Sequence, residues 1–354
     1  DKTIDELIKE GLLSEEFYKI DSSALPVYER RLYKHQTNSL RQVISGENIV
    51  VSTGTGSGKT ECFVLPIINH LMREKEKGTL GPGVRAIMIY PMNALANDQV
   101  SRFRKLLKNY EEITFGCYTG QTRETEKEAI ENYKSLHEQL PLKNEMVSRE
   151  KMRKEPPHIL ITNYAMLEYL LIRPGDKAFF THTFAEDWQL VVLDEAHVYN
   201  GAKGIEVAML LRRLKGAIKE ENLQFILTSA TLGDKKANKN VADFAINLCG
   251  ADFEANNIIR GETRSPKPNK DLTQLDISFY NKVAKLIREN ASDEAILPII
   301  EKYDSSIDRH LPIEEILYEV ILHDELYFKV RNSLDNTTKS VYDIAKQLEI
   351  SQDD

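Results

Sequence analysis

The sequence has few cysteines, a single tryptophan and no long apolar run. Its 354 residues include 3 Cys and 1 Trp, and no apolar stretch approaches the roughly 20 residues that a membrane-spanning helix needs. The thiols Cys62, Cys117 and Cys249 stand far apart and match no metal-binding spacing. We therefore expect small buried thiols in a reducing compartment, a cytoplasmic location and no membrane partner.

An excess of positive charge is also missing. The chain has 47 Lys and Arg against 55 Asp and Glu, which gives a net charge of −8. A protein that holds nucleic acid by bulk charge alone would be basic, so any polyanion must be bound in a local groove. The chain begins Asp1-Lys2-Thr3, without an initiator Met or a signal-peptide pattern. We expect it to be an internal piece of a longer protein.

Short apolar runs alternate with helical stretches from Leu32 to about Gly261. Continuously apolar runs are typical of strands that are covered on both faces, and their alternation with helices predicts an α/β fold with a mostly parallel sheet flanked by helices. The predicted strands are 49–52, 86–90, 114–118, 159–162, 190–193 and 225–228.

The chain divides into three parts by pattern. We expect a helical lead-in over 1–30, the α/β domain over 31–262, and a helical region over 263–354 that acts as a connector or insertion. Residues 121–155 are dense in Glu, Lys and Arg. They predict a solvated helical insertion or a mobile excursion within the α/β domain.

A phosphate-binding loop follows the first predicted strand. The order strand, Gly-rich loop, Gly-Lys-Thr, apolar helix lets backbone N–H groups and a helix N-terminus face one anion. Lys59 is expected to reach the β- and γ-phosphates of ATP, and the Thr60 hydroxyl to bind Mg²⁺. The alternative is a Gly-rich turn with a surface lysine. The predicted nucleotide-binding residues of this loop are Gly54, Thr55, Gly56, Ser57, Gly58, Lys59 and Thr60.

Two acids end the strand at 190–193. Paired carboxylates at the carboxyl end of a buried parallel strand are costly unless something binds there. Asp194 suits Mg²⁺, Glu195 suits the activation of a water molecule, and His197 is placed to sense the γ-phosphate. The alternative is a helix cap with a structural histidine. Together with Lys59, these three residues are the catalytic candidates.

These motifs together resemble superfamily 2 helicases of the DEAD/DEAH-box type. The resemblance implies a RecA-like P-loop NTPase domain, with Tyr33 and Gln36 as its adenine-reading element. It implies nucleic-acid contacts in Tyr90-Pro91-Met92-Asn93, Tyr118-Thr119-Gly120 and Thr162-Asn163, where Asn163 replaces the more common Pro. The contact candidates are Pro91, Asn93, Thr119, Gly120, Thr162 and Asn163. Ser229, Ala230 and Thr231 resemble the element that couples hydrolysis to the partner domain.

The stretches 166–169 and 194–214 look closest to the YprA/MrfA-type group, whose members often carry a cysteine cluster far downstream. This resemblance implies a motor that prefers DNA over RNA and acts in repair or phage defence, and other subunits of a defence or repair complex are candidate partners. An RNA helicase, a non-catalytic nucleotide switch and the motor subunit of a restriction system remain open.

A motor of this family needs a second RecA-like domain that supplies arginines to the γ-phosphate. No Gln-x-x-Gly-Arg-x-x-Arg-like element follows Thr231, so we expect that domain further along the full-length protein. Loss of trans-acting arginines costs about 10³–10⁵ in rate. The isolated chain is therefore expected to be nearly inactive.

Overall fold

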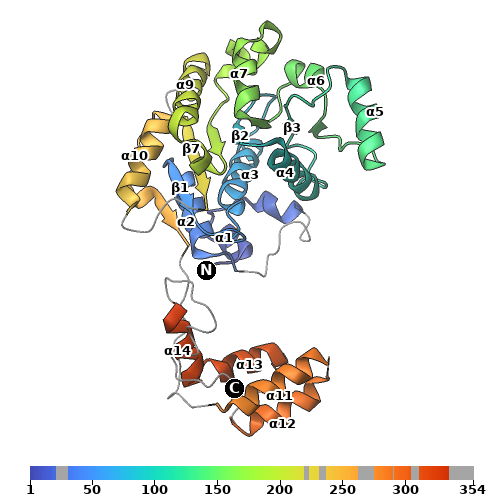
Figure 1. The fold of residues 1–354 in the computed structure, drawn as a ribbon. Coiled ribbons are helices and arrows are strands. Elements are labelled where there is room, and N and C mark those ends of the chain that lie inside the picture. The colour runs from blue at the N-terminus through green and yellow to red at the C-terminus, as the bar shows by residue number, and fades with distance from the viewer. Residues whose placement is uncertain are drawn as a thin grey trace. The chain divides into compact units, whose positions relative to one another are not determined.

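The computed structural model describes residues 1–20, 31–218, 223–230, 237–261, 275–289, 291–303 and 311–334. The chain divides into two compact units, Asp1–Glu262 and Thr263–Asp354. The first unit is a sheet with helices on both faces (Figure 1). No described helix is both long and apolar enough to cross a membrane.

The sheet of the first unit has eight strands in the order β4-β3-β5-β2-β6-β7-β1-β8, and every pairing is parallel. The predicted α/β fold is thus confirmed. All six predicted strands are present, with ends that differ by at most one residue, whereas β4 and β8 were not predicted. The bounds are β1 Ile49–Ser52, β2 Ala86–Tyr90, β3 Phe115–Cys117, β4 Glu145–Met146, β5 Ile159–Asn163, β6 Leu190–Leu193, β7 Gln224–Ser229 and β8 Ile258–Arg260.

One face of the sheet is covered by helices from the first third of the chain. Alternate strand residues such as Val51 and Met88 point into this core, because successive side chains of a strand face opposite sides. The helix α1 joins the same core through Ile4, Leu7 and Ile8 and is closed by a capping box at its N-terminus. The elements on this face are α1 Ile4–Lys9, a 3₁₀ turn Glu15–Lys19, α2 Lys34–Ile44, α3 Glu61–Glu76 and α4 Asn93–Leu106.

The opposite face is covered by helices from the middle of the unit. Here the other strand residues, such as Val50 and Ile87, belong to the same core as the buried residues of α9. Each sheet face therefore buries its own apolar layer, which fixes the strand register. These elements are α6 Arg149–Lys154, α7 Tyr164–Ile172, 3₁₀ turns Pro174–Phe180, Ala196–Val198 and Ala255–Asn257, α8 His182–Ala185, α9 Gly201–Ile218 and α10 Asn238–Cys249.

The charged segment 121–155 forms α5 (Glu126–His137), the edge strand β4 and α6. Its outer side is solvated, yet Glu145, Met146 and Ser148 are buried at its inner edge. Arg104 of α4 binds Glu145 through two side-chain nitrogens, with N–O distances of 2.7 to 2.9 Å. A buried ion pair therefore attaches this segment to α4.

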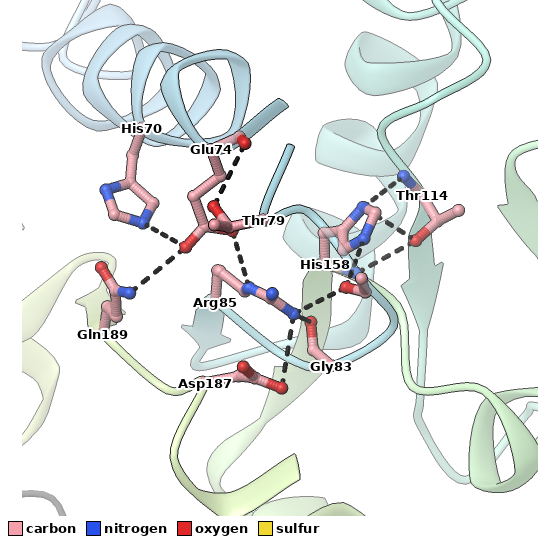
Figure 2. Close-up of polar contacts among 10 residues, drawn as sticks. His70, Glu74, Thr79, Gly83, Arg85, Thr114, His158, Asp187 and Gln189 are labelled. Atoms are coloured by element: carbon pink, nitrogen blue, oxygen red, sulfur yellow. Dashed lines mark hydrogen bonds and ion pairs between the residues drawn. The ribbon is translucent and has the colours of Figure 1, made fainter. Parts of the chain in front are cut away.

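A polar network lies just before the strands begin, at the edge of the sheet where the amino ends meet (Figure 2). Arg85 is 4% exposed, and its Nε lies 3.0 Å from Oε2 of Glu74 while its Nη1 lies 3.5 Å from Oδ2 of Asp187. It also donates to the carbonyls of Gly81 (2.8 Å) and Gly83 (3.0 Å). Burial alone would raise the pKa of Glu74, but a hydrogen bond from His70 and the charge of Arg85 hold it below its ordinary value.

His158 completes this network as a neutral ring. Its Nδ1 accepts from the backbone N–H of Thr114 (3.0 Å), so the proton must reside on Nε2, which donates to the carbonyl of Gly81 (3.0 Å). Burial lowers the pKa of His158 to about 4. The network thus depends on an uncharged imidazole beside a buried guanidinium.

The second unit is helical where it is described, with α11 Ile277–Arg288, α12 Asp293–Glu301, α13 Ile313–Ile321 and α14 Glu325–Leu334. Its small core contains Phe279, Val283, Ile300 and Ile316. Asp324 is buried and accepts from the Leu275 backbone, the Tyr280 hydroxyl and the Tyr327 backbone. This carboxylate ties three segments of the unit together.

Candidate functional site

The predicted site residues lie at the carboxyl ends of the strands. Since all strands are parallel, these ends share one edge of the sheet, opposite the Arg85 network. The strands β1, β7 and β6 are neighbours, and they carry the phosphate loop, the Ser229 segment and the Asp194–His197 segment. The strands β2, β5 and β3 are also neighbours, and they carry the predicted nucleic-acid contacts. The predictions therefore assign one part of this edge to nucleotide and the other to nucleic acid, and we call these parts the nucleotide half and the nucleic-acid half.

The phosphate loop runs from β1 to the N-terminus of α3. Thr53 takes the place of the usual first glycine, and its hydroxyl lies 2.6 Å from the Ser57 hydroxyl, which donates to the carbonyl of Gly54 (2.8 Å). Lys59 donates from Nζ to the carbonyls of Thr53 (3.1 Å) and Gly54 (3.3 Å). The ammonium therefore lies against the loop, where a triphosphate would also lie.

The predicted adenine-reading element is attached to this loop. Gln36 is buried; its Oε1 accepts from the backbone N–H of Tyr33 (2.8 Å) and its Nε2 donates to the carbonyl of Gly58 (2.9 Å). Gly58 has a φ of 74°, and a Cβ there would lie 2.4 Å from Gln36 Nε2. His35 contacts the Ser57 carbonyl at 2.9 Å. The Gln36 side chain therefore contacts the phosphate loop directly.

The acids at the end of β6 are held by Thr228 of β7. The Thr228 hydroxyl donates to Asp194 and accepts from the backbone N–H of Glu195 (3.3 Å). Burial raises the pKa of Asp194 above its ordinary value, although the Thr228 hydrogen bond and the charge of Lys59 act in the opposite direction. Lys59 and Asp194 follow β1 and β6, the two strands on either side of β7, so both lie at the same end of this part of the sheet.

Glu195 adopts a left-handed backbone conformation, with φ 49° and ψ 48°. Its Oε2 is buried without a hydrogen-bond partner among the described residues, and the Nδ1 of His197 lies 3.3 Å from it. A buried acceptor that lacks a donor is expected where a substrate water supplies one. This left-handed conformation was not predicted from periodicity.

Ser229 connects the two halves of the nucleotide site. Its carbonyl accepts from the backbone N–H of Thr53 (3.2 Å), and its hydroxyl lies 3.1 Å from Nδ1 of His197. Ala230 follows at the surface end of β7. The third predicted coupling residue, Thr231, lies outside the described residues.

Magnesium and ATP fit the residues present. Among the described residues, no group of three or more His, Cys, Asp or Glu side chains could hold a metal ion alone. This is the arrangement expected for Mg²⁺, which is usually bound by one or two carboxylates, substrate phosphates and water. Thr60 and Asp194 are the protein groups available for that role.

The nucleic-acid half divides into buried and accessible candidates. Thr162 is buried and its hydroxyl donates to the Tyr118 carbonyl (2.6 Å), while the Thr119 hydroxyl accepts from the backbone of Gln121 (3.3 Å). These two hydroxyls hold the loops. Gly120 is exposed and Pro91 is partly exposed, so both lie where a strand can reach them.

Asn163 and Asn93 act as a pair. Asn163 caps α7 by accepting from the backbone of Met166 (2.7 Å), and its Nδ2 donates to Oδ1 of Asn93 (2.6 Å). Asn163 stands at the position where proline is more common in the family that the sequence resembles. The amide at this position adds a side-chain hydrogen bond between the end of β5 and α4, which a proline could not make. Both residues are partly exposed.

Two arginines at this edge were not predicted as site residues. Arg149 of α6 donates to the Thr119 carbonyl (3.0 Å) and lies over the Tyr118 ring, 5.3 Å from its centroid. Arg102 of α4 pairs with Glu61 in the first turn of α3. A charged side chain by itself predicts a solvated position. Only the fold shows that Arg149 contacts the loop at Thr119 and that Arg102 contacts the first turn of α3.

Comparison with known proteins gives a consistent result. Residues 33–239 match the model of the DEAD/DEAH box helicase family. The Druantia protein DruE of Escherichia coli is 31% identical over 356 residues, covering 72% of this chain and 19% of DruE. The uncharacterized ATP-dependent helicase YprA of Bacillus subtilis is 32% identical over 208 residues, covering 58% of this chain and 23% of YprA. The chain thus spans about one fifth of the length of these relatives.

Solved structures share the fold. The crystal structure of the DUF1998 helicase MrfA bound to DNA aligns with a TM-score of 0.53 at 22% identity, covering 85% of this chain and 44% of MrfA. The DEAD-box helicase Mss116 bound to single-stranded RNA aligns with a TM-score of 0.54 at 21% identity, covering 87% of this chain and 55% of Mss116. The predicted family, its RecA-like fold and the likeness to the YprA/MrfA-type group are confirmed.

Proposed function

Because this chain belongs to the DEAD/DEAH box helicase family, we propose that it is the ATP-binding domain of a nucleic-acid-dependent ATPase, a DNA helicase or translocase. The observation that carries the proposal is that Lys59 and Asp194 follow β1 and β6, the two strands on either side of β7. Residues of β7 bond to both segments, since Thr228 donates to Asp194 and the Ser229 carbonyl accepts from the backbone of Thr53. A structural lysine and a capping acid would need no such arrangement.

The residues take the following roles in ATP hydrolysis. Lys59 and the backbone N–H groups of the loop bind the phosphates, and Tyr33 and Gln36 bind the adenine. Thr60 and Asp194 hold Mg²⁺, which when bound neutralises charge that develops on the phosphate oxygens. Glu195 orients the attacking water and accepts its proton, because it directly follows the metal-binding candidate Asp194 at the end of β6.

His197 has a positioning role. Its Nδ1 faces both Glu195 Oε2 (3.3 Å) and the Ser229 hydroxyl (3.1 Å). A ring in this place can report the state of the nucleotide to the segment that leads into Thr231. We infer that this route couples hydrolysis to a second RecA-like domain.

Nucleic acid binds along the ends of β2, β5 and β3. Pro91, Asn93, Gly120 and Asn163 contact the backbone, and such contacts position a strand without reading its sequence. DNA is the favoured substrate because the YprA/MrfA-type likeness extends over sequence as well as fold. RNA is the second candidate, since the RNA-bound Mss116 has the same fold.

The remaining proposals concern the longer protein. We propose that it carries a second RecA-like domain that supplies arginines to the γ-phosphate, and that it acts in the cytoplasm, in repair or in defence against phage, with or without other subunits. The second unit of this chain, Thr263–Asp354, then connects the two motor domains.

The test is ATP hydrolysis by the full-length protein with and without single-stranded DNA or RNA. We expect DNA to stimulate turnover, Lys59→Ala to abolish nucleotide binding, and Glu195→Gln to retain binding but lose turnover. Lys77→Ala at the exposed opposite end of α3 is the matched control. Stimulation by RNA alone would select the RNA helicase. Nucleotide binding without any turnover would select the nucleotide switch.

The isolated chain provides a second test. Without arginines from a partner domain, we expect weak ATP binding, a rate lower by about 10³–10⁵ and no unwinding. Robust turnover of the isolated chain that disappears in Glu195→Gln would contradict the need for a second domain.

A further inference from the structure

A cavity of about 360 Å³ lies beside the nucleic-acid half of the site. It is enclosed by α4, β3, the segment 119–123, α5 and the segment 145–147. Its volume is within the range of about 300–1,000 Å³ that small-molecule sites occupy. The charged segment 121–155 supplies most of its outer wall, which gives that segment a role beyond solvation.

The charges at the base of the cavity are already neutralised. Arg104 and Glu145 form a bidentate pair, and the Tyr133 hydroxyl donates to Glu145 Oε2 (3.2 Å). The Arg104 guanidinium lies 4.8 Å from the centre of the Tyr133 ring. Burial raises the pKa of the Cys117 thiol to about 12, so no thiolate is present. The base of the cavity therefore holds no unpaired charge and suits a neutral group.

The walls combine apolar and amide side chains. Val100, Tyr133 and Leu136 provide apolar surface, while Asn97, Gln121 and Asn132 provide amides that both donate and accept hydrogen bonds. Such a lining matches a flat, uncharged heterocycle with mixed donors and acceptors at its rim. A nucleobase is a ligand of this kind.

The cavity meets the predicted path of the strand. Thr119 lines it, directly before the exposed Gly120, and Arg123 lines it as an exposed cation. Asn97 stands one turn from Asn93, the predicted backbone contact at the start of α4. A phosphate that contacts Gly120 and Arg123 would leave its base within reach of the opening.

We propose that this cavity receives one nucleobase of the bound strand, turned out of the stack as the backbone passes Gly120. The inference rests on the proposed nucleic-acid-binding function and adds a base subsite to it. Bases of single strands are commonly bound in this way, and each contributes about 5- to 150-fold in affinity. The subsite tolerates different bases, because amides can rotate to match either a donor or an acceptor.

The experiment compares an oligothymidylate with an abasic strand of equal length, using the full-length protein. We expect the wild type to bind the base-bearing strand about 5- to 150-fold more tightly. Ser101→Phe, which extends an exposed wall residue into the cavity, is expected to bind both strands equally, at the wild-type affinity for the abasic strand. Ser135→Phe on α5 makes the same change outside the cavity and is expected to behave as the wild type.

Different results separate the two claims. If Ser101→Phe retains the full preference for bases, the subsite is refuted while the nucleic-acid function stands. If the wild type binds neither strand, the proposed function itself fails. Should Ser101→Phe not fold, cross-linking of wild type to 4-thiothymidine-containing DNA decides. Attachment to the peptide that contains Asn132 and Tyr133 supports the subsite, and attachment only elsewhere overturns it.

Discussion

Arg85 holds together the edge of the sheet opposite the nucleotide site, and we expect Arg85→Met to destabilise the first unit. The substitution keeps an unbranched apolar stem but leaves Glu74, whose side chain is 15% exposed, without the guanidinium 3.0 Å away. It also leaves the carbonyls of Gly81 and Gly83 without this donor. Removing one partner of a buried ion pair costs about 3–5 kcal/mol, a large part of the usual 5–15 kcal/mol of a folded domain.

The single tryptophan provides the assay. Trp188 is fully buried, stands between Asp187 and Gln189, and donates from Nε1 to the Phe179 carbonyl (3.1 Å). Urea unfolding followed by its fluorescence reports the first unit alone, because the chain has no other tryptophan. The expected result is a midpoint shifted to lower urea with an unchanged slope.

Two further variants test the reasoning. Arg41→Met breaks an ion pair with Glu10 in which both side chains are about 40% exposed, so it should cost about 0–1 kcal/mol. Adding Glu74→Gln to Arg85→Met removes the unpaired charge and should recover at least about 1 kcal/mol. An Arg85→Met variant no less stable than Arg41→Met would show that solvent, and not Arg85, satisfies the polar groups at this edge of the sheet.

Three other outcomes follow from contacts described above. His158 has a pKa of about 4 in the folded protein and an ordinary pKa of 6.5, so the folded state binds fewer protons and the free energy of unfolding falls by up to about 3 kcal/mol as pH falls from 6.5 to about 4. His158→Asn should lack this part of the pH dependence of unfolding, and an unchanged profile would contradict the prediction. Thr228→Val should lower ATP turnover of the full-length protein about 10- to 100-fold with little change in nucleotide affinity, and a loss of affinity alone would argue against its positioning role. Arg102→Met breaks the pair with Glu61 that joins α4 to α3. We expect the stimulation of ATP turnover by nucleic acid to fall about 2- to 30-fold while the basal rate stays equal. Unchanged stimulation would show that this ion pair does not couple nucleic-acid binding to turnover.

The strands that carry the candidate site were largely predictable from sequence, although their order in the sheet was not predicted. The strands β1, β2 and β6 are continuously apolar because both of their faces are buried, and their runs end at the polar residues that form the site. The loop Gly54–Thr60 and the acids at Asp194 were identified for the same reason. In each case local pattern and tertiary position agree.

Other parts of the site depend on contacts between distant segments. The strands β4 and β8 are short, and β4 begins with Glu145, whose burial is possible only because Arg104 lies beside it. The charge of Arg149 likewise suggests a solvated residue until α6 brings it to Thr119. Periodicity cannot predict such pairs, because neither partner is apolar and the two are far apart in sequence.

The left-handed turn at Glu195 lowers the stability of the fold at a residue that we propose takes part in hydrolysis. A φ of 49° costs a residue with a side chain about 1–3 kcal/mol, which glycine would not incur. Any selection for heat resistance that ignores activity would therefore favour glycine at position 195 and discard the carboxylate. Efforts to make this domain more robust should leave that position fixed, since its carboxylate is the group that we propose activates the attacking water.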